Sequence, residues 1–442
     1  MRRVSTSRRP RAWRSRCGLA VLGVVAGLAA GELALRTAGI RPRPHLRNRV
    51  YFAEPDPLLG WRNRPGISGP YGGQGFLTHV TINPAGQRGP FHPVARREGL
   101  RRLAVLGDSQ TWGDGVGDRE TFVARLDGDG VEALAFACLG YGTDQELLLF
   151  DSEAVRYRPD EVVVATFVGN DPYDNLSAGT FQYPKPRFRI GDDGALRLEG
   201  VPVEPPRGLH ALIEIYRTAM RYSALLNALA GLATPDAPRR APAGPVRVWH
   251  RIYSAHPTER DRSALRITAR LLVEIADHAR RARATPTVLL LPEAWQVDVA
   301  VRPAWRRQLR ELDADWRRPQ RFLRRALAVA GVRSIDALPS LARAARRASR
   351  SERSPFLGDG RHLSARGHAV VAGVLERRLG LPRFRSRLRR YESSTRERRS
   401  STPSRAPHPA DQGAPDTSSR ASTTGSRGRG TSRSAAEMAA AS

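Results

Sequence analysis

Lysine is almost absent from this chain. Of its 442 residues, 73 are lysine or arginine, and Lys185 is the only lysine. Nearly all of the formal net charge of +30 at pH 7 is therefore carried by arginine, as a GC-rich coding bias produces. The sequence also lacks zinc-finger spacings, glycine-rich phosphate loops and basic stripes interleaved with aromatic residues. The arginine surplus alone therefore predicts no nucleic-acid partner.

Cysteine is scarce as well. Cys17 and Cys138 are the only two, and Cys17 stands at the start of an apolar run near the N-terminus. We therefore expect no internal disulfide, and cysteine usage does not indicate the redox compartment. Cys138 follows a predicted strand and is interpreted as a small core residue.

The apolar run near the N-terminus covers residues 17–31, and residues 33–35 extend it beyond Glu32. Arginine is the only charged side chain in the preceding residues 1–16. By the positive-inside rule, this start stays in the cytoplasm and the rest of the chain is exported. We predict that residues 17–35 form a signal anchor, with a cleaved signal peptide as the alternative. The main domain is then either held outside the cytoplasm at the membrane or secreted.

Three short polar segments carry the residue types of a serine-dependent active site. They are Gly107-Asp108-Ser109, Gly169-Asn170-Asp171 and Asp359-Gly360-Arg361-His362. The first follows residues 103–106 and the second follows residues 161–167, and both of these runs read as buried strands. In a parallel sheet, the carboxyl ends of such strands meet at one edge. We therefore expect Ser109 and Asn170 to share that edge.

These segments supply the groups that ester cleavage by serine requires. The reaction needs a hydroxyl, a histidine base, a carboxylate that fixes the histidine tautomer, and donors for the oxyanion. Asp359 and His362 lie on one loop ahead of a predicted helix over residues 365–379, so this loop can supply base and carboxylate together. The Asn170 amide and the backbone N–H groups of Gly140 and Ser109 are candidate oxyanion donors.

The order and the flanks of these segments resemble the SGNH (GDSL-type) hydrolase family, whose blocks carry Ser, Gly, Asn and His in that order. The resemblance spans about residues 101–381, with a long unmatched middle, and all four blocks are filled. It implies Ser109 as nucleophile, Gly140 and Asn170 as oxyanion donors, His362 as base and Asp359 as its partner. The absence of Gly-x-Ser-x-Gly argues against the nucleophile elbow of the α/β-hydrolases.

A second histidine is close in sequence to the predicted base. His368 follows Gly367 inside the predicted helix over residues 365–379. This position favours a packing or capping role over that of a catalytic base.

The resemblance implies a hydrolase that acts on ester bonds and needs no metal or other cofactor. The expected substrates are acyl esters, above all acetyl esters, of carbohydrates or small molecules in the cell envelope. Two rivals use the same fold: an extracytoplasmic polysaccharide O-acetyltransferase, in which a sugar hydroxyl replaces water, and a non-catalytic envelope component. The four blocks do not separate hydrolase from transferase because both pass through the same acyl-enzyme. No oligomeric state is indicated.

The remaining sequence divides by composition. Residues 42–99 are rich in glycine, proline and aromatics and are predicted to form a small β-rich lead-in, with Trp61 packed rather than lining a sugar site. Residues 100–382 alternate strands and helices, which predicts a parallel sheet covered by helices. The resemblance implies the flavodoxin-like, three-layer α/β sandwich for this domain. The expected strands cover residues 103–106, 131–136, 161–167, 287–291 and 332–335.

Two further segments interrupt or follow this domain. Residues 174–261 form an insertion directly after the Asn170 block, read either as a lid or subsite wall or as a surface excursion. Residues 384–442 are rich in arginine and serine, with almost no large apolar side chains, and are predicted to be a disordered tail.

Overall fold

The computed structural model describes residues 11–40, 52–73, 76–180, 183–204, short pieces of 208–223, and residues 224–233, 248–297, 306–347 and 354–382. The chain divides into two compact units, Met1–Arg390 and Tyr391–Ser442. The predicted disordered tail, 384–442, lies outside the described residues.

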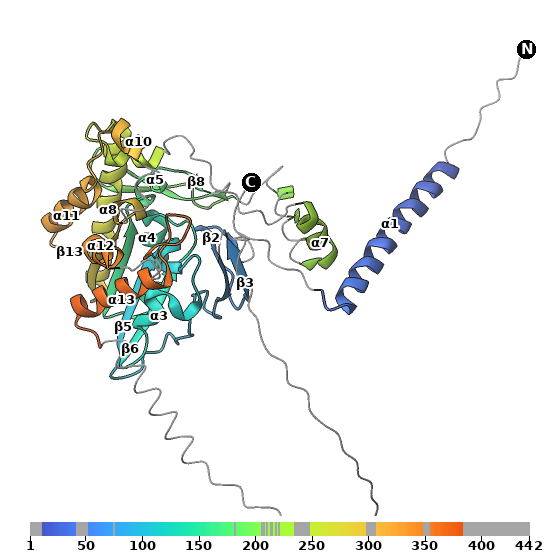
Figure 1. Ribbon diagram of the computed structural model, residues 1–442, viewed down its shortest axis with the longest axis horizontal. Helices are drawn as coiled ribbons and strands as arrows, with labels where there is room; N and C mark the ends of the chain where they lie inside the picture. The colour runs from blue at the N-terminus through green and yellow to red at the C-terminus, as the bar shows by residue number, and fades with distance from the viewer. Residues whose placement is uncertain are drawn as a thin grey trace, which may run out of the picture. The chain divides into compact units, whose positions relative to one another are not determined.

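A parallel five-stranded sheet forms the centre of the first unit (Figure 1). Its strands are β5 (Arg101–Gly107), β6 (Val131–Ala137), β7 (Glu161–Phe167), β12 (Thr285–Leu291) and β13 (Arg333–Asp336). Their spatial order is β13-β12-β7-β5-β6. This is the flavodoxin-like order, so the predicted fold class is confirmed, and each predicted strand overlaps one of these five.

Strands β5, β6, β7 and β12 are mostly apolar because both faces of the sheet are covered, whereas the edge strand β13 is Arg-Ser-Ile-Asp. In β5, Ala104 and Leu106 belong to one core cluster, whereas Leu103 and Val105 belong to the other. This alternation follows from the period of two in a strand. The sheet is therefore the middle layer between two hydrophobic cores.

Helices form the two outer layers. One core contains side chains of α4 (Thr143–Ser152), α8 (Glu259–Arg281) and α11 (Arg318–Val329). The other contains side chains of α3 (Phe122–Leu126), α12 (Leu338–Arg346) and α13 (Ala365–Leu379). Shorter helices lie in the connections: α2 (Ser109–Trp112), η2 (Asp118–Glu120), η3 (Ala154–Tyr157), α5 (Asp171–Asp174), η4 (Val248–Tyr253), α9 (Ala294–Val297) and α10 (Arg306–Glu311).

The described part of the lead-in contains four short strands. Strand β1 (Ala53–Asp56) pairs with β2 (Gly60–Asn63), and β3 (Ser68–Gly73) pairs with β4 (Phe76–Thr81), both antiparallel. Trp61 is buried, and its indole N–H donates to the carbonyl of Leu139 at 3.0 Å. This contact supports the interpretation of Trp61 as a packed aromatic.

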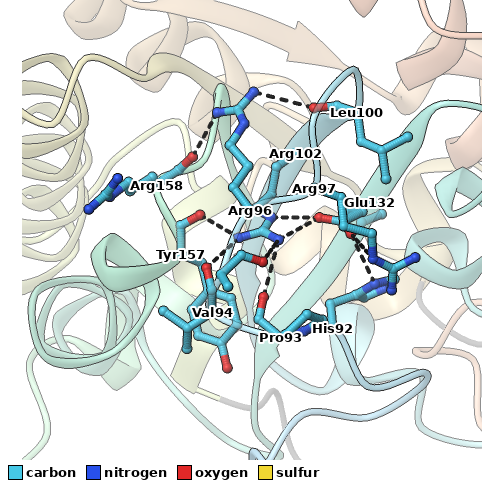
Figure 2. A network of polar contacts seen from close by, with 12 residues as sticks. His92, Pro93, Val94, Arg96, Arg97, Leu100, Arg102, Glu132, Tyr157 and Arg158 are labelled. Atoms are coloured by element: carbon cyan, nitrogen blue, oxygen red, sulfur yellow. Dashed lines mark hydrogen bonds and ion pairs between the residues drawn. The ribbon is translucent and has the colours of Figure 1, made fainter.

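A buried ion pair joins the end of the lead-in to the sheet (Figure 2). Arg102 on β5 is 0% exposed, and its Nη2 lies 2.6 Å from Oε2 of Glu132 on β6. The same guanidinium donates to the carbonyls of Pro93 (3.1 Å), Val94 (3.0 Å) and Tyr157 (2.8 Å). Figure 2 shows this guanidinium surrounded by the carbonyls and the carboxylate. Arg102 therefore fixes the chain just before β5 enters the sheet.

The insertion contains short antiparallel strands and one apolar helix. The strands are β8 (Gly179–Thr180) with β9 (Tyr183–Pro184), and β10 (Arg187–Ile190) with β11 (Leu196–Glu199), and the helix is α7 (Ala224–Ala233). Lys185, next to β9, is buried and forms an ion pair with Asp144 on α4. Its Nζ also donates to the carbonyl of Asp174 at 3.0 Å. The only lysine thus ties the insertion to α4 and α5.

The N-terminal helix is α1 (Arg11–Thr37). Its segment Gly18–Thr37 is long and apolar enough to cross a membrane by length and composition, a test that a signal sequence also passes. Near its C-terminal end, the Glu32 carboxylate accepts from the backbone N–H groups of Ala224 and Leu225, both at 2.9 Å. This interaction caps the start of α7.

Candidate active site

Ser109 lies where β5 ends and α2 begins. Asp108 is the N-cap, and its carboxylate accepts from the backbone N–H of Gln110 at 2.9 Å. A Cβ on Gly107 would lie 2.0 Å from Thr111 Oγ1, so only glycine permits this sharp exit from the strand. The Ser109 hydroxyl is thereby presented at the carboxyl edge of the sheet, as expected.

A relay of three side chains connects Ser109 to the C-terminal loop. Ser109 Oγ lies 3.0 Å from His362 Nε2, and His362 Nδ1 lies 2.6 Å from Asp359 Oδ2. The other oxygen, Asp359 Oδ1, accepts from the backbone N–H groups of Arg361 (2.9 Å) and His362 (3.0 Å). These contacts direct the carboxylate toward Nδ1, which favours the tautomer with its lone pair on Nε2.

Gln110, the residue after the nucleophile, binds the backbone of the His362 loop on both sides of the histidine. Its Nε2 donates to the carbonyl of Arg361 at 3.1 Å, and its Oε1 accepts from the N–H of Leu363 at 3.1 Å. The side chain therefore fixes the backbone on either side of the histidine. Sequence reasoning placed Gln110 only in the flank of the first block, because a glutamine after a serine carries no signal of this contact.

Asp114 is a fourth polar residue at the relay, which sequence reasoning missed. Its Oδ2 lies 3.6 Å from His362 Nε2, the nitrogen that faces Ser109. It stands between Gly113 (φ 88°) and Gly115 (φ 91°), and Gly-Asp-Gly reads in sequence as an ordinary turn. A carboxylate five positions after the nucleophile was the available signal.

Two of the predicted oxyanion donors are backbone N–H groups of buried residues. Within the described residues, the N–H groups of Ser109 and Gly140 form no hydrogen bond. Gly140 has a φ of 78°, which glycine adopts without strain. The adjacent carbonyl of Leu139 accepts from Trp61, so the lead-in supports this loop.

The Asn170 amide, the third predicted donor, is engaged by carboxylates. Its Nδ2 donates to Asp174 Oδ2 at 2.6 Å, and its side chain also hydrogen-bonds to Asp108, the neighbour of the nucleophile. Burial raises the pKa of Asp174 to about 6, although Asn170 and Lys185 favour its charged form. Asn170 thus lies beside the Ser109 segment, as expected, and an oxyanion would compete with these carboxylates for its hydrogens.

His368 lies away from the relay. Its Nδ1 accepts from the backbone N–H of Phe122 at 3.1 Å, and its ring stacks on Phe122 at a centroid distance of 5.7 Å. Burial, with Arg88 and Arg125 nearby, lowers its pKa to about 3. The neutral ring therefore serves packing and capping, as its place in the helix predicted.

Comparisons with known proteins find similarity only among solved structures. No family model and no curated protein sequence matches the chain. A GDSL-like lipase from Bacteroides thetaiotaomicron is 11% identical, with 63% of this chain and 88% of that chain covered and a TM-score of 0.31. A catalytic mutant of an acetylxylan esterase from Geobacillus stearothermophilus is 10% identical, with 64% and 95% covered and a TM-score of 0.34. A lipase/acylhydrolase from Enterococcus faecalis is 13% identical, with 64% and 98% covered and a TM-score of 0.33.

The electrostatics of the relay shift the pKa values of Asp359 and His362 toward their charged forms. Burial disfavours the Asp359 carboxylate, but its hydrogen bond to His362 and the backbone N–H groups outweigh this and lower its pKa to about 2. Burial also lowers the pKa of His362, whereas Asp114 and Asp359 raise it, and the net shift is upward. The histidine is therefore a stronger base than a free imidazole.

Further buried acids interact with Asp108, the residue before the nucleophile. Burial raises the pKa of Asp108, and burial together with neighbouring carboxylates raises the pKa values of Glu146 and Asp171 well above their usual range. Neither carboxyl oxygen of Glu146 has a hydrogen-bond partner among the described residues. The charged forms of these acids are disfavoured, so this region carries less negative charge than its number of acids suggests. In the described parts of the chain, no group of three or more histidine, cysteine or acidic side chains is arranged to hold a metal ion.

Proposed function

We propose that the protein is a serine esterase of the SGNH type. The observation that carries this proposal is the relay from Ser109 Oγ to His362 Nε2 (3.0 Å) and from His362 Nδ1 to Asp359 (2.6 Å). It joins residues 253 positions apart at the point where the sheet order reverses between β5 and β7, the usual ligand crevice of such folds. The ordered Ser, Gly, Asn and His blocks support the same reading.

The chemistry follows the geometry of the relay. Ser109 Oγ attacks the ester carbonyl while His362 Nε2 takes its proton, which forms a tetrahedral oxyanion. The N–H groups of Ser109 and Gly140 and the Asn170 amide are the proposed donors to that oxyanion. The alkoxide leaves with the proton from His362, and the acyl group stays on Ser109. Water, deprotonated by His362, then releases the acid and restores the hydroxyl.

The proposed substrates are acetyl or other short acyl esters of carbohydrates or small molecules in the cell envelope. The family resemblance supports the ester class, and the apolar helix α1 supports a location at or beyond the membrane. Transfer of the acyl group to a sugar hydroxyl instead of water is the alternative outcome for the same acyl-enzyme.

The test is hydrolysis of p-nitrophenyl acetate by the purified full chain in detergent. We expect Ser109→Ala and His362→Ala each to lower kcat/KM by about a thousandfold or more, because each breaks the relay. Ser263→Ala and His278→Ala are matched controls on α8 outside the site and should retain full activity. A folded parent that is inactive and in which a serine-directed phosphonate does not label Ser109 would overturn the proposal. With an oligosaccharide acceptor added, the ratio of acylated oligosaccharide to free acid compares acyl transfer with hydrolysis.

A further inference from the structure

The imidazole of His362 lies between two carboxylates. Asp359 meets Nδ1, and Asp114 Oδ2 lies 3.6 Å from Nε2 on the side of the nucleophile. Asp114 is only 5% exposed, so water screens its charge weakly. A carboxylate on the Nε2 side is not needed to fix the tautomer, since Asp359 already does so. Its position calls for a separate explanation.

The lead-in orients the Asp114 carboxylate. The Tyr71 hydroxyl on β3 donates to Asp114 Oδ1 at 3.0 Å, which leaves Oδ2 directed toward His362. Arg88, also from the lead-in, is buried and donates to the carbonyls of Trp112 (2.8 Å), Gly113 (2.6 Å) and Val116 (2.6 Å). These bonds hold the loop on both sides of Asp114. The small β-rich segment therefore contributes to the relay through Asp114 and its loop.

The position of the Asp114 loop is fixed relative to Ser109. The backbone N–H of Asp114 donates to the Ser109 carbonyl at 3.0 Å. A Cβ on Gly113 would lie 2.5 Å from Thr121 Cγ2, and one on Gly115 would lie 2.2 Å from Leu357 Cδ1. Both glycines also have positive φ. Close packing and glycine geometry thus fix the distance between Asp114 and His362.

We propose that Asp114 is a positioning residue that holds the protonated form of His362 from the nucleophile side and so sets the lowest pH at which the site works. This inference rests on the proposed function of the relay. It adds to the proposed activity a lower pH limit. A residue outside the four family blocks sets this limit.

The physical reason is the charge that appears on His362 when it takes the Ser109 proton. An opposite charge within about 4 Å stabilises that imidazolium, which assists the attack. In the resting site the same attraction keeps His362 protonated at lower pH, where no base is available. The other charged or titratable groups that act on His362 are Asp359 and Arg361 on its own loop, Asp108 at the start of α2, and His368 on α13.

The decisive variant is Asp114→Asn, which keeps the shape and the acceptor for Tyr71 but removes the charge. We expect the midpoint of the His362 titration, followed by NMR with labelled histidine, to fall by about one pH unit. The acid limb of the kcat/KM profile should move down by the same amount, while the plateau at high pH falls by only about threefold. The variant would therefore be more active than the parent at acid pH and less active at alkaline pH. Loss of a residue with a purely structural role would not make the pH profiles of variant and parent cross.

Two controls separate the charge from the packing. Asp118→Asn removes one charge from the same region, where Asp118 accepts from Arg88 Nε at 2.9 Å, and should leave the His362 midpoint unchanged. Tyr71→Phe keeps the Asp114 charge but removes the hydrogen bond that orients it, so the His362 midpoint should fall by less than in Asp114→Asn. If Asp114→Asn does not fold, Asp114→Ser provides a second, smaller uncharged variant.

The titration distinguishes this inference from the proposed function. An unchanged His362 midpoint in folded Asp114→Asn, or an equal fall in Asp118→Asn, would overturn the role of Asp114. A lowered midpoint in a protein with no esterase activity would leave the electrostatic role intact and defeat only the proposed reaction.

Discussion

At the residue scale, the His362–Asp359 pair links the chemistry of the site to the stability of the fold. Asp359 has a lowered pKa of about 2, so its contribution to stability is present above its unfolded value and is lost as pH falls toward 2. His362 has a raised pKa, so its contribution is present below its unfolded value and is lost as pH rises through the folded value. The pair therefore contributes most in mildly acidic solution.

We expect Asp359→Asn to lower the free energy of unfolding by about 1 to 2 kcal/mol near pH 5, and by less near pH 9. As pH rises through the raised pKa of folded His362, the imidazolium is lost and the ion pair is lost with it in the parent as well. Urea unfolding at the two pH values measures the difference. Asp193→Asn, on an exposed turn, is the control and should show no pH-dependent loss. A loss for Asp359→Asn that is larger at pH 9 would contradict the charged pair.

At the scale of elements, the junction between the lead-in and the sheet depends on one buried guanidinium. Arg102 pairs with Glu132 and also satisfies the carbonyls of Pro93, Val94 and Tyr157. A buried ion pair contributes little net stability when intact, but removal of one partner leaves a charge or polar groups without compensation.

Arg102→Met should therefore cost about 3 to 5 kcal/mol of unfolding free energy, because it leaves Glu132 and several carbonyls unpaired. Glu132→Gln should cost less, about 1 to 3 kcal/mol, because the arginine keeps its carbonyl partners. Arg97→Met is the matched control: its side chain is 58% exposed and lies 3.3 Å from the same carboxylate, so its loss should cost under about 1 kcal/mol. Denaturant unfolding gives all three values. A cost for Arg97→Met equal to that for Arg102→Met would refute the importance of burial.

The elements that sequence reasoning could predict are those with local signals. The run 161–167 is apolar except at Glu161 and Thr166 and forms β7 with those bounds, and helix α13 starts after the Ser364 cap and ends at Gly380 as local capping rules predict. The relay was predictable because its blocks carry distinctive residue types. Arg102 and Asp114 were not, since their roles depend on contacts with residues 30 and 248 positions away, which no local pattern encodes.

At the scale of the whole molecule, the question is how an N-terminal apolar helix relates to the enzyme-like unit. The described segment Gly18–Thr37 is 20 residues long, which matches the length needed to span a bilayer. Arginine is the only charged residue type before it in the sequence. By the positive-inside rule, this combination predicts a start in the cytoplasm and a sheet domain outside.

We predict that the full chain, produced in cells, sediments with membranes and resists extraction by carbonate. Val25→Arg places a charge in the middle of the apolar segment at a cost of about 2.5 to 3.5 kcal/mol to insertion, so it should shift much of the protein out of the membrane fraction. Val329→Arg, at a site on α11 that is 91% exposed, is the matched control and should leave the distribution unchanged. Protease added outside intact spheroplasts should digest the sheet domain. Digestion only after lysis would place the domain in the cytoplasm, and a soluble product that begins beyond residue 37 would identify a cleaved signal sequence instead of an anchor.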